Sequence, residues 1–436
     1  MVTLAVGKEG TAPNIGPRLA PGIELTLRVL AAALQIATTL AVVRALPPPI
    51  AGLYFRGAVI AYGLAAVLRG KYDLFIAHCF VSTIPLNCGV PHRPLVRALG
   101  IRVLLRSAIA CAVLLVVTSD LDVVEPRLRP FLETYLPFVL AVPCATLALF
   151  LSAALRAVNR TLGSVIVAGY CMNAVILTVA VTASGLPADS ALFILSWGFF
   201  VGAAVAALVG VLVTRRVFEV PAEQIEVVPT AWKQIYATAG THGQSGLALA
   251  ALQWGPLCLL ALLGSAVQIA EYAVVTRTAQ IIDFLVPAVI IVPQSTQLRS
   301  RFARARDSEL GKLSIDLAVS LATTSACVLT VGVLTPWFAD LYGAPYSGLA
   351  LLFVLLFAVQ WINGVSRPAL RYLTAHWDLG RNRRILLSGA AAAIMVPLLG
   401  VPRFGPVAAA AGGLVAVLLQ SALSLRAAFK GCRGGC

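Results

Sequence analysis

The chain has 436 residues, of which 59% are hydrophobic and 12% are charged, and its formal net charge is +15. A water-soluble domain cannot bury so much apolar surface, so the composition excludes soluble classes and predicts an all-α membrane protein with many spans. A strong positive charge is also typical of nucleic-acid-binding proteins, but basic residues gather in the cytoplasmic loops of membrane proteins whatever these carry. We therefore expect a lipid bilayer as partner and no nucleic acid.

The N-terminal region and the cysteines predict neither a leader nor a metal site. Residues 1–23 are polar, with no compact apolar core before a cleavage site, so no removable signal peptide is expected. Most of the nine cysteines lie in apolar segments without a CxxC pair, as small packing residues do. A His/Cys group near one loop fits no standard zinc spacing; its members are His78, Cys79, Cys88 and His92. No metal and no cofactor are expected.

Twelve apolar segments follow, each long enough to cross a bilayer whose hydrocarbon core is about 30 Å thick. The predicted spans are 24–44, 50–69, 99–118, 131–154, 163–183, 190–213, 238–262, 267–293, 314–335, 347–369, 385–401 and 406–425. An even number of spans puts both termini on one side. With that side in the cytoplasm, most of the 33 Lys and Arg residues fall in cytoplasmic segments, which predicts an N-in, C-in topology.

A weak internal repeat divides the chain. Ile50 to Tyr54, after the first span, is matched by Ile269 to Tyr272 after the seventh, and Ala154 to Arg156 is matched by Ala369 to Arg371 at nearly the same offset. The repeat predicts two pseudosymmetric six-helix lobes, a duplication that suits alternating access. The predicted domains are a cytoplasmic tail 1–23, an N-lobe 24–213, a cytoplasmic linker 214–237, a C-lobe 238–428 and a tail 429–436.

Polar and ionisable residues lie inside several spans. The eighth span carries Glu271, Arg277 and Asp283, which are costly in hydrocarbon and are expected to face protein or water, as on a transport path. Helical spacing adds polar faces on the first, seventh and eighth spans. These faces are predicted to line a lumen. Besides Glu271 and Asp283, the polar residues predicted to line it are Gln35, Thr39, His242, Gln253 and Gln280.

Four stretches of the chain resemble a known family. The segments Gln253 to Gln294, Thr335 to Arg384, Val401 to Gly413 and Val42 to Phe55 are similar to bacterial polysaccharide-repeat (O-antigen) flippases of the multidrug/oligosaccharidyl-lipid/polysaccharide (MOP) exporter superfamily. They include the loop pattern F-x-x-L-Y-G-x-x-Y, formed by Phe338, Leu341, Tyr342, Gly343 and Tyr346. Many relatives carry an acidic residue near Gln253, and this departure puts an ion-coupling role of that position in doubt.

The resemblance implies a MATE-like fold with a V-shaped cavity lined by the first, second, seventh and eighth helices. It also implies movement of an undecaprenyl-diphosphate-linked oligosaccharide to the outer leaflet of the bacterial cytoplasmic (inner) membrane, for lipopolysaccharide or other polysaccharide biosynthesis. Such a substrate calls for a cationic lumen, and arginine can grip phosphate oxygens bidentately. The predicted substrate-binding residues are Arg28, Arg56 and Arg277.

Other interpretations of these residues remain open. Arg28 and Arg56 can extend to the nearest interface, and Arg277 can pair with Asp283 or Glu271 to hold helices together. His242 is more readily a hydrogen-bonded packing residue than a proton relay.

Two other functions remain open. A cation-coupled multidrug antiporter of the same superfamily needs buried carboxylates, and only Glu271 and Asp283 lie well inside spans. A membrane glycosyltransferase or polysaccharide polymerase needs catalytic groups in a sizeable aqueous loop, and the predicted outer loops are short. We therefore expect a transporter rather than an enzyme, with no catalytic residue. A monomer is expected. The sequence leaves open the sugar composition of the substrate and whether transport is coupled to an ion gradient or to the membrane potential. It also leaves open whether a polymerase or a glycosyltransferase is a partner.

Overall fold

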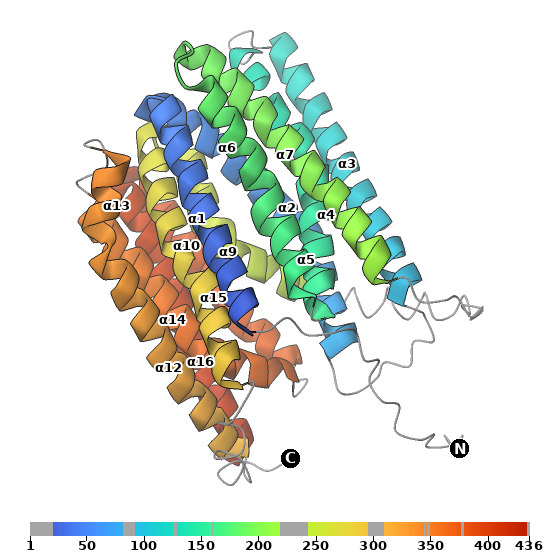
Figure 1. Ribbon diagram of the computed structural model, residues 1–436, viewed down its shortest axis with the longest axis vertical. Helices are drawn as coiled ribbons and strands as arrows, with labels where there is room; N and C mark the ends of the chain where they lie inside the picture. Colours follow the sequence, from blue (N-terminus) through green and yellow to red (C-terminus); the bar gives the residue numbers. More distant parts are fainter. Residues whose placement is uncertain are drawn as a thin grey trace.

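The structure is a computed structural model, and every regular element that it describes is a helix (Figure 1). It describes residues 21–81, 92–124, 129–158, 160–218, 243–294, 309–343, 346, 349–375 and 379–433. Four members of the His/Cys group (His78, Cys79, Cys88 and His92) and the predicted lumen residue His242 are residues or side chains outside this description, as are residues 1–20 and most of the predicted linker.

The first half of the chain consists mainly of long helices. Apolar residues rich in Leu, Val and Ala favour helix in a membrane, because a helix satisfies its own backbone hydrogen bonds. The elements are α1 (Pro21–Ala45), α2 (Pro48–Val81), α3 (His92–Val124), α4 (Arg129–Ala157), α5 (Thr161–Val165), the π-helical η2 (Ile166–Tyr170), α6 (Cys171–Ala183) and α7 (Ala188–Val217).

The second half is built in the same way. Its elements are α9 (Gly243–Leu263), α10 (Ala266–Gln294), α12 (Glu309–Val333), α13 (Thr335–Tyr342), α14 (Ala350–Ala375), α15 (Leu379–Phe404) and α16 (Pro406–Arg433). The first turn of α1 and the last turn of α16 lie at the same end of the bundle, drawn at the bottom of Figure 1. We call this the lower end and the opposite one the upper end.

The predicted membrane spans agree with the helices. By length and composition, eleven spans of the described chain can cross a membrane, and they coincide with eleven of the twelve predicted segments. The other predicted segment, 267–293, is α10, whose 29 residues extend over about 43 Å. The fold class, an all-α membrane protein, is confirmed. The two-lobe arrangement and the N-in, C-in orientation stay predictions.

Helix packing gathers the elements into two sets. In the first set α4 packs against α2, α3 and α7, and α6 packs against α7 and α1. In the second, α15 and α16 pack together and against α9, while α14 packs against α12 and α16. The main contacts between the sets join α1 to α10 and α2 to both α9 and α10. These four helices are the ones that the resemblance places around a cavity.

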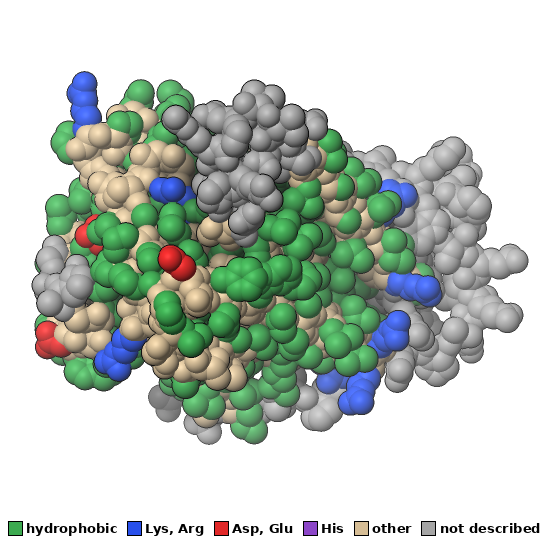
Figure 2. Space-filling view, turned by 90° about the horizontal axis from the view of Figure 1, so that it is seen from above, with side chains coloured by type: hydrophobic (Ala, Val, Ile, Leu, Met, Phe, Trp, Pro, Cys, Tyr) green, Lys and Arg blue, Asp and Glu red, His purple; other side chains and the backbone are tan. Residues whose placement is uncertain are grey.

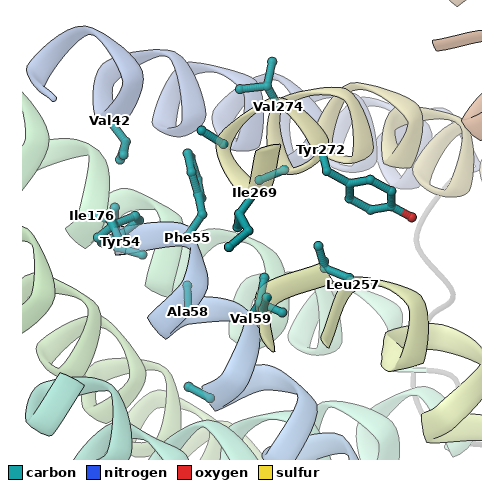
Figure 3. Packing of buried hydrophobic residues seen from close by; sticks show 14 of the residues in the cluster. Val42, Tyr54, Phe55, Ala58, Val59, Ile176, Leu257, Ile269, Tyr272 and Val274 are labelled. Atoms are coloured by element: carbon teal, nitrogen blue, oxygen red, sulfur yellow. The ribbon is translucent and has the colours of Figure 1, made fainter. Parts of the chain in front are cut away.

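The apolar core is continuous across this junction. One cluster of buried side chains includes Phe55 of α2, Leu257 of α9 and Val274 of α10, and Figure 3 shows these side chains between the helices. Large apolar side chains also cover the outside of the bundle, where Leu329 and Leu399 are 68% and 71% exposed. Figure 2 shows hydrophobic side chains spread over the upper end with few charged ones between them. Exposed apolar side chains on the sides of the helices, such as Leu329 and Leu399, are what a lipid-facing protein needs.

Two local features differ from the sequence prediction. The predicted loop 336–346 contains the short helix α13, because Pro336 suits the first turn of a helix and Gly343, with φ of 93°, ends it. The fifth predicted span is interrupted by η2. In this stretch Tyr170 donates a hydrogen bond to the carbonyl oxygen of Leu27 in α1, at 2.6 Å. Extra-residue bulges of this kind are frequent at functional sites.

Candidate functional site

The junction of α1, α2, α9 and α10 brings backbones into close contact. A Cβ atom at Gly52 of α2 would collide with the carbonyl group of Ala266, the first residue of α10. Farther along α2, a Cβ atom at Gly70 would lie 2.9 Å from the carbonyl oxygen of Gly246 in α9. Because neither contact atom is a flexible side chain, glycine permits these approaches. The helices of the two sets are therefore packed together near the start of α2 and again about two thirds of the way along it.

Three polar side chains meet near the middle of α1 and α10. Gln35 of α1 is buried, and its Nε2 donates a hydrogen bond to Oε1 of Gln280 at 2.8 Å. Arg277, one turn before Gln280 on α10, donates from Nη1 to the same oxygen at 3.3 Å. One amide oxygen thus accepts from both helices, which aligns the guanidinium with the junction.

Two aromatic residues continue this group toward α9. The guanidinium carbon of Arg277 lies 5.9 Å from the centre of the Tyr62 ring on α2, within the range of a cation–π contact. Tyr62 in turn stacks on Trp254 of α9, with ring centres 5.5 Å apart and planes 14° apart. The Tyr62 hydroxyl donates to the sulfur of Met172 at 2.9 Å. We call Gln35, Tyr62, Trp254, Arg277 and Gln280 the central site.

The central site can bind an anion and a polyhydroxylated group together. Arg277 is half-buried, and the contacts that the structure shows for it are with a neutral amide and a neutral ring. Its charge is held in place but not cancelled by them. Amide side chains suit hydroxyl groups as donors and acceptors, and an aromatic ring offers an apolar face. The described residues contain no group of three or more His, Cys, Asp or Glu side chains that could hold a metal ion.

Solved structures share this arrangement of helices. An outward-facing multidrug-resistance MATE family transporter of the MOP superfamily aligns over 98% of this chain and 99% of its own, with a TM-score of 0.56 and 12% identity. The chain has a MATE fold. A MOP superfamily transporter from Pyrococcus furiosus, described as having a binding pocket of reversed polarity, aligns over 97% of this chain and 99% of its own, with a TM-score of 0.51 and 12% identity. No protein-family model and no curated protein sequence matches.

The three predicted arginines occupy different heights of the MATE fold. Arg277 belongs to the central site. Arg56 lies nearer the upper end, where its Nη2 donates to the carbonyl oxygen of Gly264 at 2.8 Å, just after the last residue of α9. That carbonyl carries the negative end of the helix dipole, so the contact ties α2 to the turn between α9 and α10. Arg28 lies two turns below Gln35 on α1, about 10 Å lower along the axis, where it faces Arg156 of α4.

The other predicted residues divide between the junction and its surroundings. Thr39 is buried and donates to the carbonyl oxygen of Gln35 within α1, at 2.9 Å. Gln253 is exposed, although the next residue, Trp254, is in the central site. Glu271 is half-buried near Tyr346, whose pKa rises to about 12 because of burial and the negative charge of Glu271. Asp283 lies in α10, but its side chain is outside the described part of the structure.

Sequence reasoning missed Tyr62 and Trp254. Aromatic residues in apolar spans are typical packing residues, and neither lies in a polar face. A signal was present for Trp254, because it adjoins Gln253 in the stretch that carries the family resemblance. Tyr62 lies six residues after Arg56, a spacing that places it about 9 Å farther along α2.

Proposed function

We propose that the chain is a membrane transporter that works by alternating access and moves a polyprenyl-diphosphate-linked oligosaccharide from the inner to the outer leaflet. The observation that carries this proposal is the setting of Arg277. Its guanidinium is half-buried near the middle of α10, among Gln280, Tyr62 and Gln35. A cation held by neutral partners inside a membrane protein attracts an anion, and a diphosphate offers several acceptor oxygens to one guanidinium.

The remainder of the central site supports a sugar-bearing substrate. Gln35 and Gln280 form a hydrogen bond with each other in this conformation and can exchange it for hydroxyl groups. Tyr62 and Trp254 lie on helices of different sets, so a relative movement of α2 and α9 would separate their rings and expose apolar faces. Alternating access requires this kind of movement between halves.

The family resemblance supplies the rest of the proposal. Because the similar family consists of bacterial polysaccharide-repeat flippases, we place the chain in the bacterial cytoplasmic (inner) membrane. The translocated lipid-linked oligosaccharide would then be the substrate of a polysaccharide polymerase or a glycosyltransferase on the outer side. Arg28 and Arg277, at two heights of the bundle, would attract the diphosphate in succession, while Arg56 would hold α2 to the turn between α9 and α10.

A vesicle assay tests this function. The purified chain is reconstituted with a fluorescent polyprenyl-diphosphate oligosaccharide whose label is quenched only in the outer leaflet. We expect wild-type protein to move the lipid, and Arg277→Ala to be no faster than protein-free vesicles. Arg403→Ala serves as the control, because Arg403 is exposed at the end of α15 and loses the same charge. Equal rates for Arg277→Ala and wild type would refute the role of Arg277.

A cation-coupled multidrug antiporter is the second candidate. It is favoured by Glu271, a half-buried carboxylate in the second turn of α10, and by the fold shared with a multidrug MATE transporter. Deleting the gene in a bacterial host separates the two candidates. The flippase predicts accumulation of lipid-linked oligosaccharide on the inner leaflet with unchanged drug resistance. The antiporter predicts higher sensitivity to cationic drugs and no lipid accumulation.

A further inference from the structure

A second group of charged residues lies in the lower parts of α1, α2 and α4, away from the central site. Arg69 and Asp73, one turn apart on α2, form an ion pair of 2.6 Å between Nη1 and Oδ2. The same Nη1 lies 3.5 Å from the carbonyl oxygen of Leu149 in α4, to which it donates. The two side chains are 14% and 20% exposed, so the pair is largely enclosed. With Arg28 and Arg156 we call this group the lower cluster.

Charge in the lower cluster is unbalanced. Asp73, which lies beyond the membrane-spanning part of α2, feels the positive charges of both Arg69 and Arg156. Burial raises the pKa of its carboxyl group, and the two guanidinium groups act in the opposite direction. Arg156 is also close enough to Arg69 and Arg28 to be repelled by their positive charges. These four residues carry three guanidinium groups and one carboxylate, and two of the guanidinium groups, those of Arg69 and Arg156, act on the carboxylate directly.

The lower cluster also has unmet hydrogen-bonding capacity. Nε of Arg69 and Oδ1 of Asp73 are buried and have no hydrogen-bond partner among the described residues. The side chain of Arg156 is exposed, so a ligand can reach it. A buried donor without a partner is costly, and an oxygen of an anion would satisfy Nε of Arg69, although it would not satisfy Oδ1 of Asp73, which is an acceptor.

We propose that Arg69 and Arg156, with Arg28 beside them, bind the phosphate groups of a lipid diphosphate at the lower end of the bundle. Planar guanidinium groups bind phosphate oxygens bidentately, and two of them can share one diphosphate. Asp73 holds Arg69 in position while the site is empty and competes with the incoming anion. The identification of the ligand as a lipid diphosphate rests on the proposed function. The inference that this site binds phosphate groups does not. Arg28 then links this site to the central site, about 10 Å higher along α1.

Binding of inorganic pyrophosphate tests the site. The full chain is purified in nanodiscs of phosphatidylcholine, and its dissociation constant for pyrophosphate is measured at fixed salt. We expect Arg69→Gln and Arg156→Gln each to weaken binding about tenfold, which is about 1.4 kcal/mol. Arg215→Gln should leave binding unchanged, because Arg215 is exposed in the last turn of α7 and loses the same charge. Equal weakening by all three variants would refute the proposed site, because it would show that pyrophosphate is attracted only by the overall positive charge of the protein.

Asp73→Asn gives a test that misfolding cannot imitate. Removing the competing carboxylate should tighten pyrophosphate binding several-fold, whereas a damaged protein would bind less. Unchanged or weaker binding by a variant with wild-type thermal stability would overturn the role given to Asp73 and, with it, the site at Arg69.

The source of the phosphate is determined by competition in the same nanodiscs. We expect a few mole percent of polyprenyl diphosphate to displace pyrophosphate and the same fraction of phosphatidylglycerol to leave it bound. Equal displacement by both lipids would overturn the assignment to a lipid diphosphate in favour of a bilayer phospholipid. If vesicles show no transport but pyrophosphate binds through Arg69 and Arg156, the proposed function fails and the anion site stands.

Discussion

Gln35 and Gln280 are 245 positions apart, and a hydrogen bond of 2.8 Å joins their side chains across the junction of α1 and α10. The same oxygen of Gln280 also accepts a hydrogen bond from Nη1 of Arg277. A single amide therefore orients the guanidinium and links the two sets of helices. Any movement that parts α1 from α10 must break this bond, which couples the position of the proposed anion-binding group to the conformation of the bundle.

Gln280→Glu should remove anion transport. A carboxylate in place of the amide would pair with Arg277 and cancel its charge, so we expect the rate of lipid-diphosphate transport to fall at least tenfold. Gln280→Met is the matched control, because it removes the hydrogen bonds but adds no charge, and it should retain a substantial part of the activity. Both rates are measured in vesicles at equal protein content. Equal losses would show that hydrogen bonding, rather than the charge of Arg277, limits transport.

The sequence specifies much of this fold and less of the site. Apolar length alone locates the spans, because each must cross a hydrocarbon layer of fixed thickness. Helical periodicity identified Gln35 and Gln280, and the cost of a charge in hydrocarbon identified Arg277. Neither could show that the three side chains share one oxygen, since that depends on how α1 packs against α10. The expectation of a cationic lumen grouped Arg28 with the other two predicted arginines, whereas the structure places it near Arg156. Periodicity determines a residue's place on its own helix and not which neighbour it faces.

Tyr62 and η2 show a further limit. A tyrosine in an apolar span is ordinarily a packing residue, and its contact with Arg277 arises only when α2 and α10 meet. A π-helical turn differs from an α-helical one by a single extra residue, which leaves no mark on an apolar pattern.

Gly52→Ala should destabilise the chain in this conformation. The new methyl group would meet the backbone carbonyl of Ala266, which cannot rotate away, so α2 and α10 must separate. We expect a loss of about 1–3 kcal/mol, as for other overpacked contacts, and a lower melting temperature in detergent. Gly332→Ala in α12 is the control, because a Cβ atom there meets nothing within 4 Å. A melting temperature equal to that of Gly332→Ala would contradict the close contact.

Arg56→Gln should cost stability more than transport. The shorter side chain loses the hydrogen bond to Gly264, a charged-group interaction worth about 1.5–3 kcal/mol. Arg44→Gln is a matched control, since the exposed Arg44 donates to the carbonyl of Leu341 over a longer distance, 3.4 Å, and its loss should cost little. Thermal unfolding and transport per folded molecule are measured for both. A transport defect as deep as that of Arg277→Ala, at wild-type stability, would instead make Arg56 a direct substrate ligand.

Glu271→Gln separates the two candidate functions within one assay. An antiporter that cycles a proton or cation through this carboxylate would stop when the charge is removed, because an amide can neither release a proton nor balance a cation. A flippase that depends on Arg277 has no such need, so we expect transport of the lipid diphosphate to stay within about twofold of wild type from pH 6 to pH 8. Glu309→Gln, at the lower end of α12, controls for the loss of one acidic group. Loss of transport in Glu271→Gln alone, with the protein folded, would place the coupling ion at Glu271 and favour the antiporter.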